Sequence, residues 1–187
     1  VNLRHPSERE RRERYAAILA AKRAREGYTF EEANDKMFER NYFGMMMVEN
    51  GDADAFVTGL YTKYSNTIKV AKEVIGMQEG FSTFATMHIL NSKRGTYFVA
   101  DTLINRAPDL ETIIDIARLA EKSVRFFNRE PVIAMASYSN FGSDKGGTAE
   151  RVKNAVAYLH EKYPDWAIDG EIQVNVAMNS ELRDKKY

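Results

Sequence analysis

Cysteine is absent from this sequence, which excludes disulfide bonds and thiolate metal sites. Histidine is scarce, and the three histidines are scattered, so neither metal-ligand spacing nor a nucleophile-and-base arrangement appears. No apolar run approaches the ~18 residues that a membrane helix needs. The first residues also lack the apolar core of a signal peptide. We therefore expect a soluble cytoplasmic protein that has no membrane partner.

An excess of one charge is also missing. Lysine and arginine number 27, and aspartate and glutamate number 27, so the net charge indicates no nucleic-acid partner. What the sequence does have is ten phenylalanines and ten tyrosines in 187 residues. This is enough apolar material for one ordinary domain or two small ones.

Helix start signals dominate the beginning of the chain. Ser7 and Glu10 have the spacing of a capping box, and the helix that they open is expected to end near Gly27. Thr29 and Glu32 repeat the capping-box spacing before a short second helix. The first third of the chain is therefore expected to be helical.

A strand is expected after a third helix. That helix runs from about Asn41 to a stop at Gly51, and residues 53–59 then have the pattern of a short buried strand. Residues 64–67 are interpreted as a polar turn, and residues 68–75 as a helix. The pattern changes after Gly76, so we expect a first lobe over 1–76 and a second over 77–187.

The second lobe alternates strands with helices. Residues 82–90 and 95–100 are expected to be strands around a turn, and Asp109 to cap a long amphipathic helix. A buried strand over 132–136 leads through a polar loop into a helix from Thr148. A last strand, 166–168, precedes a turn at 169–171. This alternation indicates an α/β architecture.

The loop between residues 137 and 147 is the strongest candidate for binding an anion. The first N–H groups of a helix have no internal partner, and glycine and serine let a phosphate approach and add donors. We expect an anion near Ser139, Gly142 and Ser143. The alternative is an ordinary turn, because the loop matches neither GxxxxGK[ST] nor GxGxxG.

Ligands in α/β sheets bind at the carboxyl ends of strands. Three polar segments satisfy that rule in the predicted fold, residues 64–67, 137–143 and 169–175. Further candidate ligand contacts in them are Ser65, Thr67, Ser137 and Asp169. Asp169 and Glu171 could act as an acid or base, or could simply organise a turn.

Several segments together resemble the phosphate acetyl/butyryltransferase family. They are Arg23 before Gly27, Tyr42-Phe43-Gly44-Met45-Met46, Gly51 to Gly59, Thr67-Ile68-Lys69-Val70, Ala134 to Ser139, and Ile168 to Val174. The branch that they resemble most is the transferase-like C-terminal domain of bacterial NADP-dependent malic enzymes, which Tyr64 to Ala71 and Tyr138 to Gly142 also match.

The resemblance implies a three-layer α/β/α fold of the phosphotransacetylase type (isocitrate/isopropylmalate dehydrogenase-like), with two lobes around a cleft. It implies that Arg23 helps bind coenzyme A or phosphate. Lys69 stands where the family has a second arginine and lacks the bidentate fork that grips a phosphate. The family pattern has opening strands and a C-terminal Ser-Arg pair and Asp that are not found here, so we expect a fragment.

Three functions fit these observations. The resemblance favours a regulatory domain that binds acetyl-CoA or an acyl phosphate, in a parent that converts malate to pyruvate and CO2. No cofactor is expected in this chain, whereas NADP and Mg or Mn are implied for the parent. The alternatives are an active phosphate acetyltransferase and a structural module that holds a homodimer together. The sequence identifies no catalytic residue.

Overall fold

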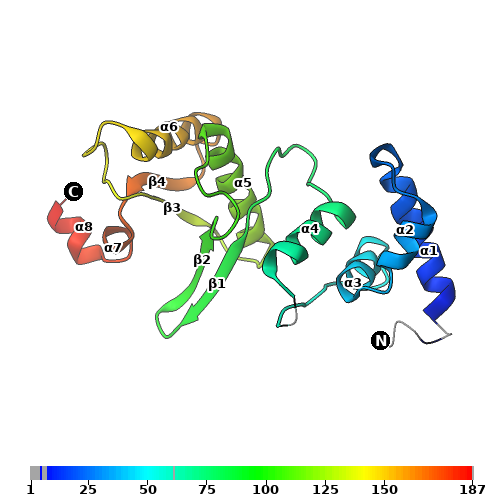
Figure 1. Cartoon of the computed structure of the whole chain (residues 1–187). Helices are drawn as coiled ribbons and strands as arrows, with labels where there is room; N and C mark the ends of the chain where they lie inside the picture. Colours follow the sequence, from blue (N-terminus) through cyan, green and yellow to red (C-terminus); the bar gives the residue numbers. More distant parts are fainter. Residues whose placement is uncertain (1–4, 6–7, 61, 187) are drawn as a thin grey trace. The chain divides into compact units, whose positions relative to one another are not determined.

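The computed structural model describes residues 5, 8–60 and 62–186. The chain divides into two compact units, Val1–Gln78 and Glu79–Tyr187. Helices and two small sheets make up the described part, so the α/β class predicted from the sequence is confirmed (Figure 1).

All the regular elements among the described residues of the first unit are helices. Its elements are α1 (Arg9–Lys22), the 3-10 helix η2 (Ala24–Glu26), α2 (Phe30–Lys36), α3 (Arg40–Glu49) and α4 (Tyr64–Val74). The capping box at Thr29 and Glu32 is confirmed, whereas Ser7 lies outside the described residues. Gly27 ends the first helical segment with a left-handed φ of 84°, a conformation that glycine adopts without strain.

The core of the first unit is formed by apolar faces of all four α-helices. Its fully buried side chains include Tyr15, Leu19, Met37, Met46 and Val74. The ring of Tyr15 meets that of Phe43 edge-on, with the ring centroids 5.3 Å apart.

The predicted strand over residues 53–59 is wrong, because this segment is irregular and largely exposed. One side chain explains its path: the ring of Phe56 packs where a Cβ on Gly44 would stand, with a ring carbon 2.2 Å from that position. The chain therefore packs against α3 here instead of joining a sheet. The predicted turn over 64–67 is also wrong, because these residues form the first turn of α4.

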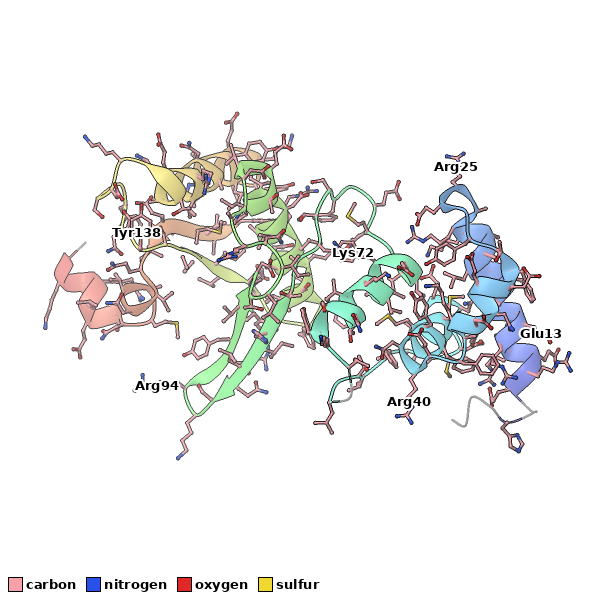
Figure 2. All side chains as sticks on the ribbon, in the orientation of Figure 1. Glu13, Arg25, Arg40, Lys72, Arg94 and Tyr138 are labelled. Atoms are coloured by element: carbon pink, nitrogen blue, oxygen red, sulfur yellow. The ribbon has the colours of Figure 1, made fainter. Side chains whose placement is uncertain are left out.

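The second unit contains both sheets. Its elements are β1 (Met87–Ser92), β2 (Gly95–Ala100), α5 (Leu110–Phe126), β3 (Val132–Ala136), α6 (Gly147–Lys162), β4 (Ala167–Ile172), α7 (Val174–Ala177) and α8 (Ser180–Lys186). Strands β1 and β2 form an antiparallel hairpin whose turn carries Arg94 (Figure 2). Strand β1 begins five residues later than predicted, because 82–86 are irregular. Asp109 caps α5 as predicted, since its carboxylate accepts a hydrogen bond from Thr112 N.

Strands β3 and β4 are parallel neighbours, and Ile133 pairs with Ile168. Helix α6 packs over β4 and against α5, so the two helices and the strands share a core around Ala117, Leu159 and Ile168 (Figure 1). The turn predicted over 169–171 is wrong, because β4 continues to Ile172. This extension places Glu171 inside the strand, next to the loop that follows β3.

Candidate functional site

Two residues at the end of α1 donate hydrogen bonds to the carbonyl groups at the end of α4. The side chain of Lys22 donates to the carbonyl oxygens of Val74 and Ile75, and Arg23 donates to those of Lys72 and Glu73. Lys72 is labelled on α4 in Figure 2. The last carbonyl groups of a helix have no partner within the helix and carry partial negative charge. Two adjacent cations thus satisfy four consecutive carbonyl groups, which gives Arg23 a structural role.

Glu73 is the residue at which both candidate cations meet. Arg23 Nε donates to the Glu73 carbonyl oxygen at 2.8 Å, and Lys69 Nζ lies 3.8 Å from Glu73 Oε1. The other carboxylate oxygen accepts a hydrogen bond from Tyr28 at 2.7 Å and a second one from Tyr42. Arg23 and Lys69, singled out separately in the sequence, therefore contact two different groups of the same residue: Arg23 its carbonyl oxygen and Lys69 its carboxylate.

Lys36 completes the cluster around Glu73. Its ammonium donates to the hydroxyl of Tyr42 at 2.9 Å and lies 3.6 Å from Glu73 Oε2. Burial disfavours the charged forms, but the hydrogen bonds outweigh it: those from Tyr42 and Tyr28 lower the pKa of Glu73, and those with the same tyrosines raise the pKa of Lys36. Both groups are therefore charged at neutral pH.

A polar pocket lies beside this cluster, lined by Glu26, Gly27, Tyr28, Glu32 and Lys36. Glu26 also pairs with Arg23, with 2.6 Å between Oε1 and Nη1. Because the lining includes the carboxylates of Glu26 and Glu32, the pocket itself would repel a phosphate. The side chain of Lys69 is 70% exposed, so Lys69 is more accessible to a ligand than Arg23.

Ser65, Lys69 and Glu73 lie four residues apart along α4 and therefore share one face of the helix. Ser65 is exposed in the first turn. Thr67 points elsewhere, because its hydroxyl accepts a hydrogen bond from the side chain of the buried Asn41, 3.4 Å away. The strand that would have put Ser65 and Thr67 at a sheet edge does not form, so their part in ligand binding stays a prediction.

The loop after β3 brings Ser139, Gly142 and Ser143 together. The hydroxyl oxygens of Ser139 and Ser143 are 3.0 Å apart, and Gly142 N donates to Glu171 Oε1 at 2.5 Å. Ser139 Oγ donates to the same carboxylate oxygen at 3.2 Å. The loop lies at the carboxyl end of β3, as predicted, and a buried carboxylate from β4 occupies its inner side.

Ser137 and Asp169 are outside this contact group. Ser137 N donates to the carbonyl oxygen of Ile172, which continues the pairing of β3 with β4. Asp169 is exposed, and its carboxylate accepts a hydrogen bond from Gly170 N. Tyr138, labelled in Figure 2, donates to Asp144 at 2.6 Å and closes the outer side of the loop. Ligand contact by Ser137 or Asp169 stays a prediction.

Glu73 is absent from the sequence prediction, and Glu171 enters it only as a possible acid, base or turn residue. Glu73 gives no local signal, because most of its partners are distant in the sequence: Arg23, Tyr28, Lys36 and Tyr42. Glu171 does give one: it stands next to the apolar Ile172 at the end of a strand, where a buried charge would require a partner.

The described residues contain no group of three histidine, aspartate or glutamate side chains that could hold a metal ion. In the same residues, each helix is too short or too polar to span a bilayer.

The whole chain, residues 1–187, matches the model of the phosphate acetyl/butaryl transferase family. It is 32% identical to the phosphate acetyltransferase of Synechocystis over 186 residues, which cover 100% of this chain and 27% of that protein. It is 33% identical to the NADP-dependent malic enzyme of Escherichia coli over 163 residues, or 87% of this chain and 22% of that enzyme. The chain thus spans about a quarter of the length of these relatives.

The solved structures agree with this match. The phosphotransacetylase of Streptococcus pyogenes superposes with a TM-score of 0.79 at 28% identity, over 99% of this chain and 55% of that one. The EutD phosphotransacetylase of Staphylococcus aureus gives 0.75 at 26% identity, over 100% and 56%. The phosphotransacetylase-like fold expected from the sequence is confirmed, and the chain belongs to the phosphate acetyl/butaryl transferase family.

Proposed function

We propose that this chain is a regulatory domain that binds acetyl-CoA, or an acyl phosphate, and belongs to an NADP-dependent malic enzyme. The observation that carries the proposal is that Arg23 and Lys69 both contact Glu73, Arg23 at its carbonyl oxygen and Lys69 at its carboxylate. Both positions match those at which the family pattern has phosphate-binding arginines. A ligand phosphate beside Lys69 would gain a charge-assisted contact with an accessible ammonium.

Binding without turnover is the expected behaviour. Lysine at position 69 offers a point charge, whereas arginine offers two parallel donors that fix the orientation of a phosphate. The donors of Arg23 are partly engaged by α4 and Glu26. Losing one preorganised charged contact costs about 2–4 kcal/mol of transition-state stabilisation, roughly 30- to 1,000-fold in rate.

The second candidate is an active phosphate acetyltransferase. Relatives with that name favour it, among them the enzyme of Acetivibrio thermocellus, 35% identical over 95% of this chain and 55% of its own length. In this reaction a phosphate oxygen attacks the thioester carbonyl, and coenzyme A leaves as the thiolate. The protein would position the two substrates and stabilise the oxyanion.

Calorimetric titration with acetyl-CoA tests binding directly. We expect saturable binding that Lys69→Ala weakens by about 5- to 30-fold, the equivalent of ~1–2 kcal/mol for one charged contact. Lys122→Ala is the control, since Lys122 is an exposed lysine on helix α5 of the second unit. Equal affinities for wild type and Lys69→Ala would refute the assignment of Lys69. If the titration gives only the heat of dilution, the chain does not bind acetyl-CoA, and the structural module would remain as its function.

An assay for acetyl phosphate formation separates the two remaining candidates. We expect no turnover from the 187-residue chain with acetyl-CoA and phosphate. Turnover comparable to that of a full-length transferase would establish the enzymatic alternative. Sedimentation velocity of the same samples tests the homodimer that we propose as the assembly.

A further inference from the structure

The loop that the sequence suggests as an anion site already contains an anion of the protein itself. Glu171 is 1% exposed, and its Oε1 accepts hydrogen bonds from Gly142 N at 2.5 Å and Ser139 Oγ at 3.2 Å. Ser139 is itself 3% exposed. A carboxylate is not placed in a protein interior without donors, because the loss of hydration is costly.

The backbone of the loop is shaped around this residue. Phe141 and Gly142 both have left-handed φ angles, 46° and 80°. Two successive residues with positive φ angles are characteristic of a tight turn. Both N–H groups go to Glu171: Phe141 N donates to its carbonyl oxygen at 2.8 Å, and Gly142 N to its carboxylate.

Several other polar groups of the loop also have partners within the protein. The hydroxyl of Ser143 accepts a hydrogen bond from Asn140 N at 3.1 Å, and that of Ser139 accepts one from Asp144 N at 3.1 Å. The side chain of Asn140 accepts one from Gln173 N at 2.8 Å. Among these groups, the donors that could face a phosphate on the inner side are the two that face Glu171.

We propose that Glu171 is a specificity-determining residue of the loop: its carboxylate takes the place of an external anion and excludes phosphate from the donors of Gly142 and Ser139. Steric occupation and charge act together, because a phosphate would have to approach a buried negative charge at contact distance. This proposal is independent of ligand binding at Lys69. It replaces the sequence prediction of an anion at Ser139 and Gly142 with an internal one.

The Glu171 carboxylate can be tested by replacing it with a free carboxylate. Glu171 Oε2 is buried and has no hydrogen-bond partner in the described structure. Removing the side chain beyond Cβ in Glu171→Ala deletes a CH2–COO⁻ group, which has the shape and charge of acetate. Free acetate should therefore fill the space and accept the same two hydrogen bonds.

The first experiment uses the wild-type chain and needs no substitution. Inorganic phosphate is titrated while the NMR resonance of the Gly142 amide is followed. We expect the resonance to stay in place, because its partner is Glu171. A saturable shift of this resonance would overturn the proposal.

The second experiment measures the melting temperature of Glu171→Ala as acetate is added. We expect a saturable rise with acetate, since a ligand that binds only the folded state stabilises it. Phosphate should now shift the Gly142 amide, or compete with acetate. A melting temperature that ignores acetate would overturn the proposal. If the variant folds only with acetate, the proposal is supported; if it folds in neither condition, the wild-type titration decides.

Two further variants separate the role of the carboxylate from general stability. Glu171→Gln keeps an acceptor oxygen and fills the same volume, so acetate should not stabilise it. Glu161→Ala removes an exposed glutamate from α6 and should respond to acetate as the wild type does. A rise of the same size in all variants would show a general salt effect and would overturn the proposal.

Discussion

Replacing Asp101 by asparagine should destabilise the second unit, because this carboxylate organises the chain after β2. One oxygen accepts hydrogen bonds from Thr86 N at 2.9 Å, from the Thr86 hydroxyl and from Leu103 N at 3.3 Å. The other accepts from Ile104 N at 3.3 Å and from the main-chain and side-chain nitrogens of Asn105 at 2.6 and 2.8 Å. Both oxygens are therefore needed as acceptors.

The magnitude follows from the donors that asparagine would leave unmatched. Its amide replaces one acceptor oxygen by an NH2 group, which would face donors in either orientation. Each hydrogen bond to a charged group contributes ~1.5–3 kcal/mol, and the contributions are not additive, so we expect a loss of about 2–4 kcal/mol. For a chain of this size the melting temperature should fall by roughly 2–4 °C for each kcal/mol.

The pH dependence has a definite sign. Burial raises the pKa of Asp101, but the hydrogen bonds from Thr86, Asn105 and Leu103 outweigh it and hold the pKa well below the ordinary range. A carboxylate with a lowered folded-state pKa stabilises the protein above its unfolded pKa of about 4 and loses that contribution as the pH falls. The difference between wild type and Asp101→Asn should therefore be full at pH 7 and shrink below pH 4.

Urea denaturation at neutral and acidic pH measures this difference. Asp165→Asn, at an exposed aspartate in the same unit, controls for the loss of one negative charge. Equal stabilities of wild type and Asp101→Asn at pH 7 would refute the reasoning, as would a difference that grows on acidification.

Other substitutions test the packing. Gly44→Ala should destabilise the first unit, despite a helix-propensity gain of about 1 kcal/mol, because the new Cβ meets the Phe56 ring; a raised urea midpoint would contradict this. Gly170→Ala should lower the melting temperature, because its φ is 146° and a Cβ would stand 2.6 Å from the Met135 carbonyl oxygen. An unchanged melting temperature would show that β3 and β4 can separate there. Arg23→Ala should cost about 1–3 kcal/mol by freeing two α4 carbonyl groups. Arg25→Ala, at an exposed arginine, should cost little, and equal losses would contradict the role of Arg23.

Local signals predict the helices of this fold. The Thr29 capping box, the Asp109 cap and the helix beginning after the Gly146-Gly147 pair depend on residues within one turn of one another. Such signals can be found without knowing the tertiary structure.

The predictions that fail concern segments whose structure depends on contacts with residues distant in the sequence. Residues 53–59 have the composition of a strand, but Phe56 fits against Gly44 of α3, and none of the described residues of the first unit forms a strand. The polar composition of residues 64–67 favours a turn. They form a helix whose far end is satisfied by Lys22 and Arg23, and no pattern around residue 64 reveals that contact.

The candidate site, like the fold, can be predicted from the sequence only in part. The family pattern identifies Arg23 and Lys69, but their shared contact with Glu73 depends on the hydrogen bonds of Arg23 to the end of α4. The glycine and serine composition of the loop after β3 predicts an anion-binding conformation. It cannot show that Glu171, 29 residues after Gly142, supplies the anion.

The most direct test of the regulatory proposal uses the parent enzyme. Malate oxidation is measured against acetyl-CoA concentration in the intact enzyme, in the variant with Arg23 and Lys69 both changed to alanine, and in a Lys122→Ala control. A ligand shifts activity only if it binds two states unequally, and a coupling of ~1–3 kcal/mol would give a clear response. We predict that acetyl-CoA alters the rate in the intact and control enzymes and not in the double variant. An intact enzyme that ignores acetyl-CoA, or a double variant that responds normally, would contradict the proposal.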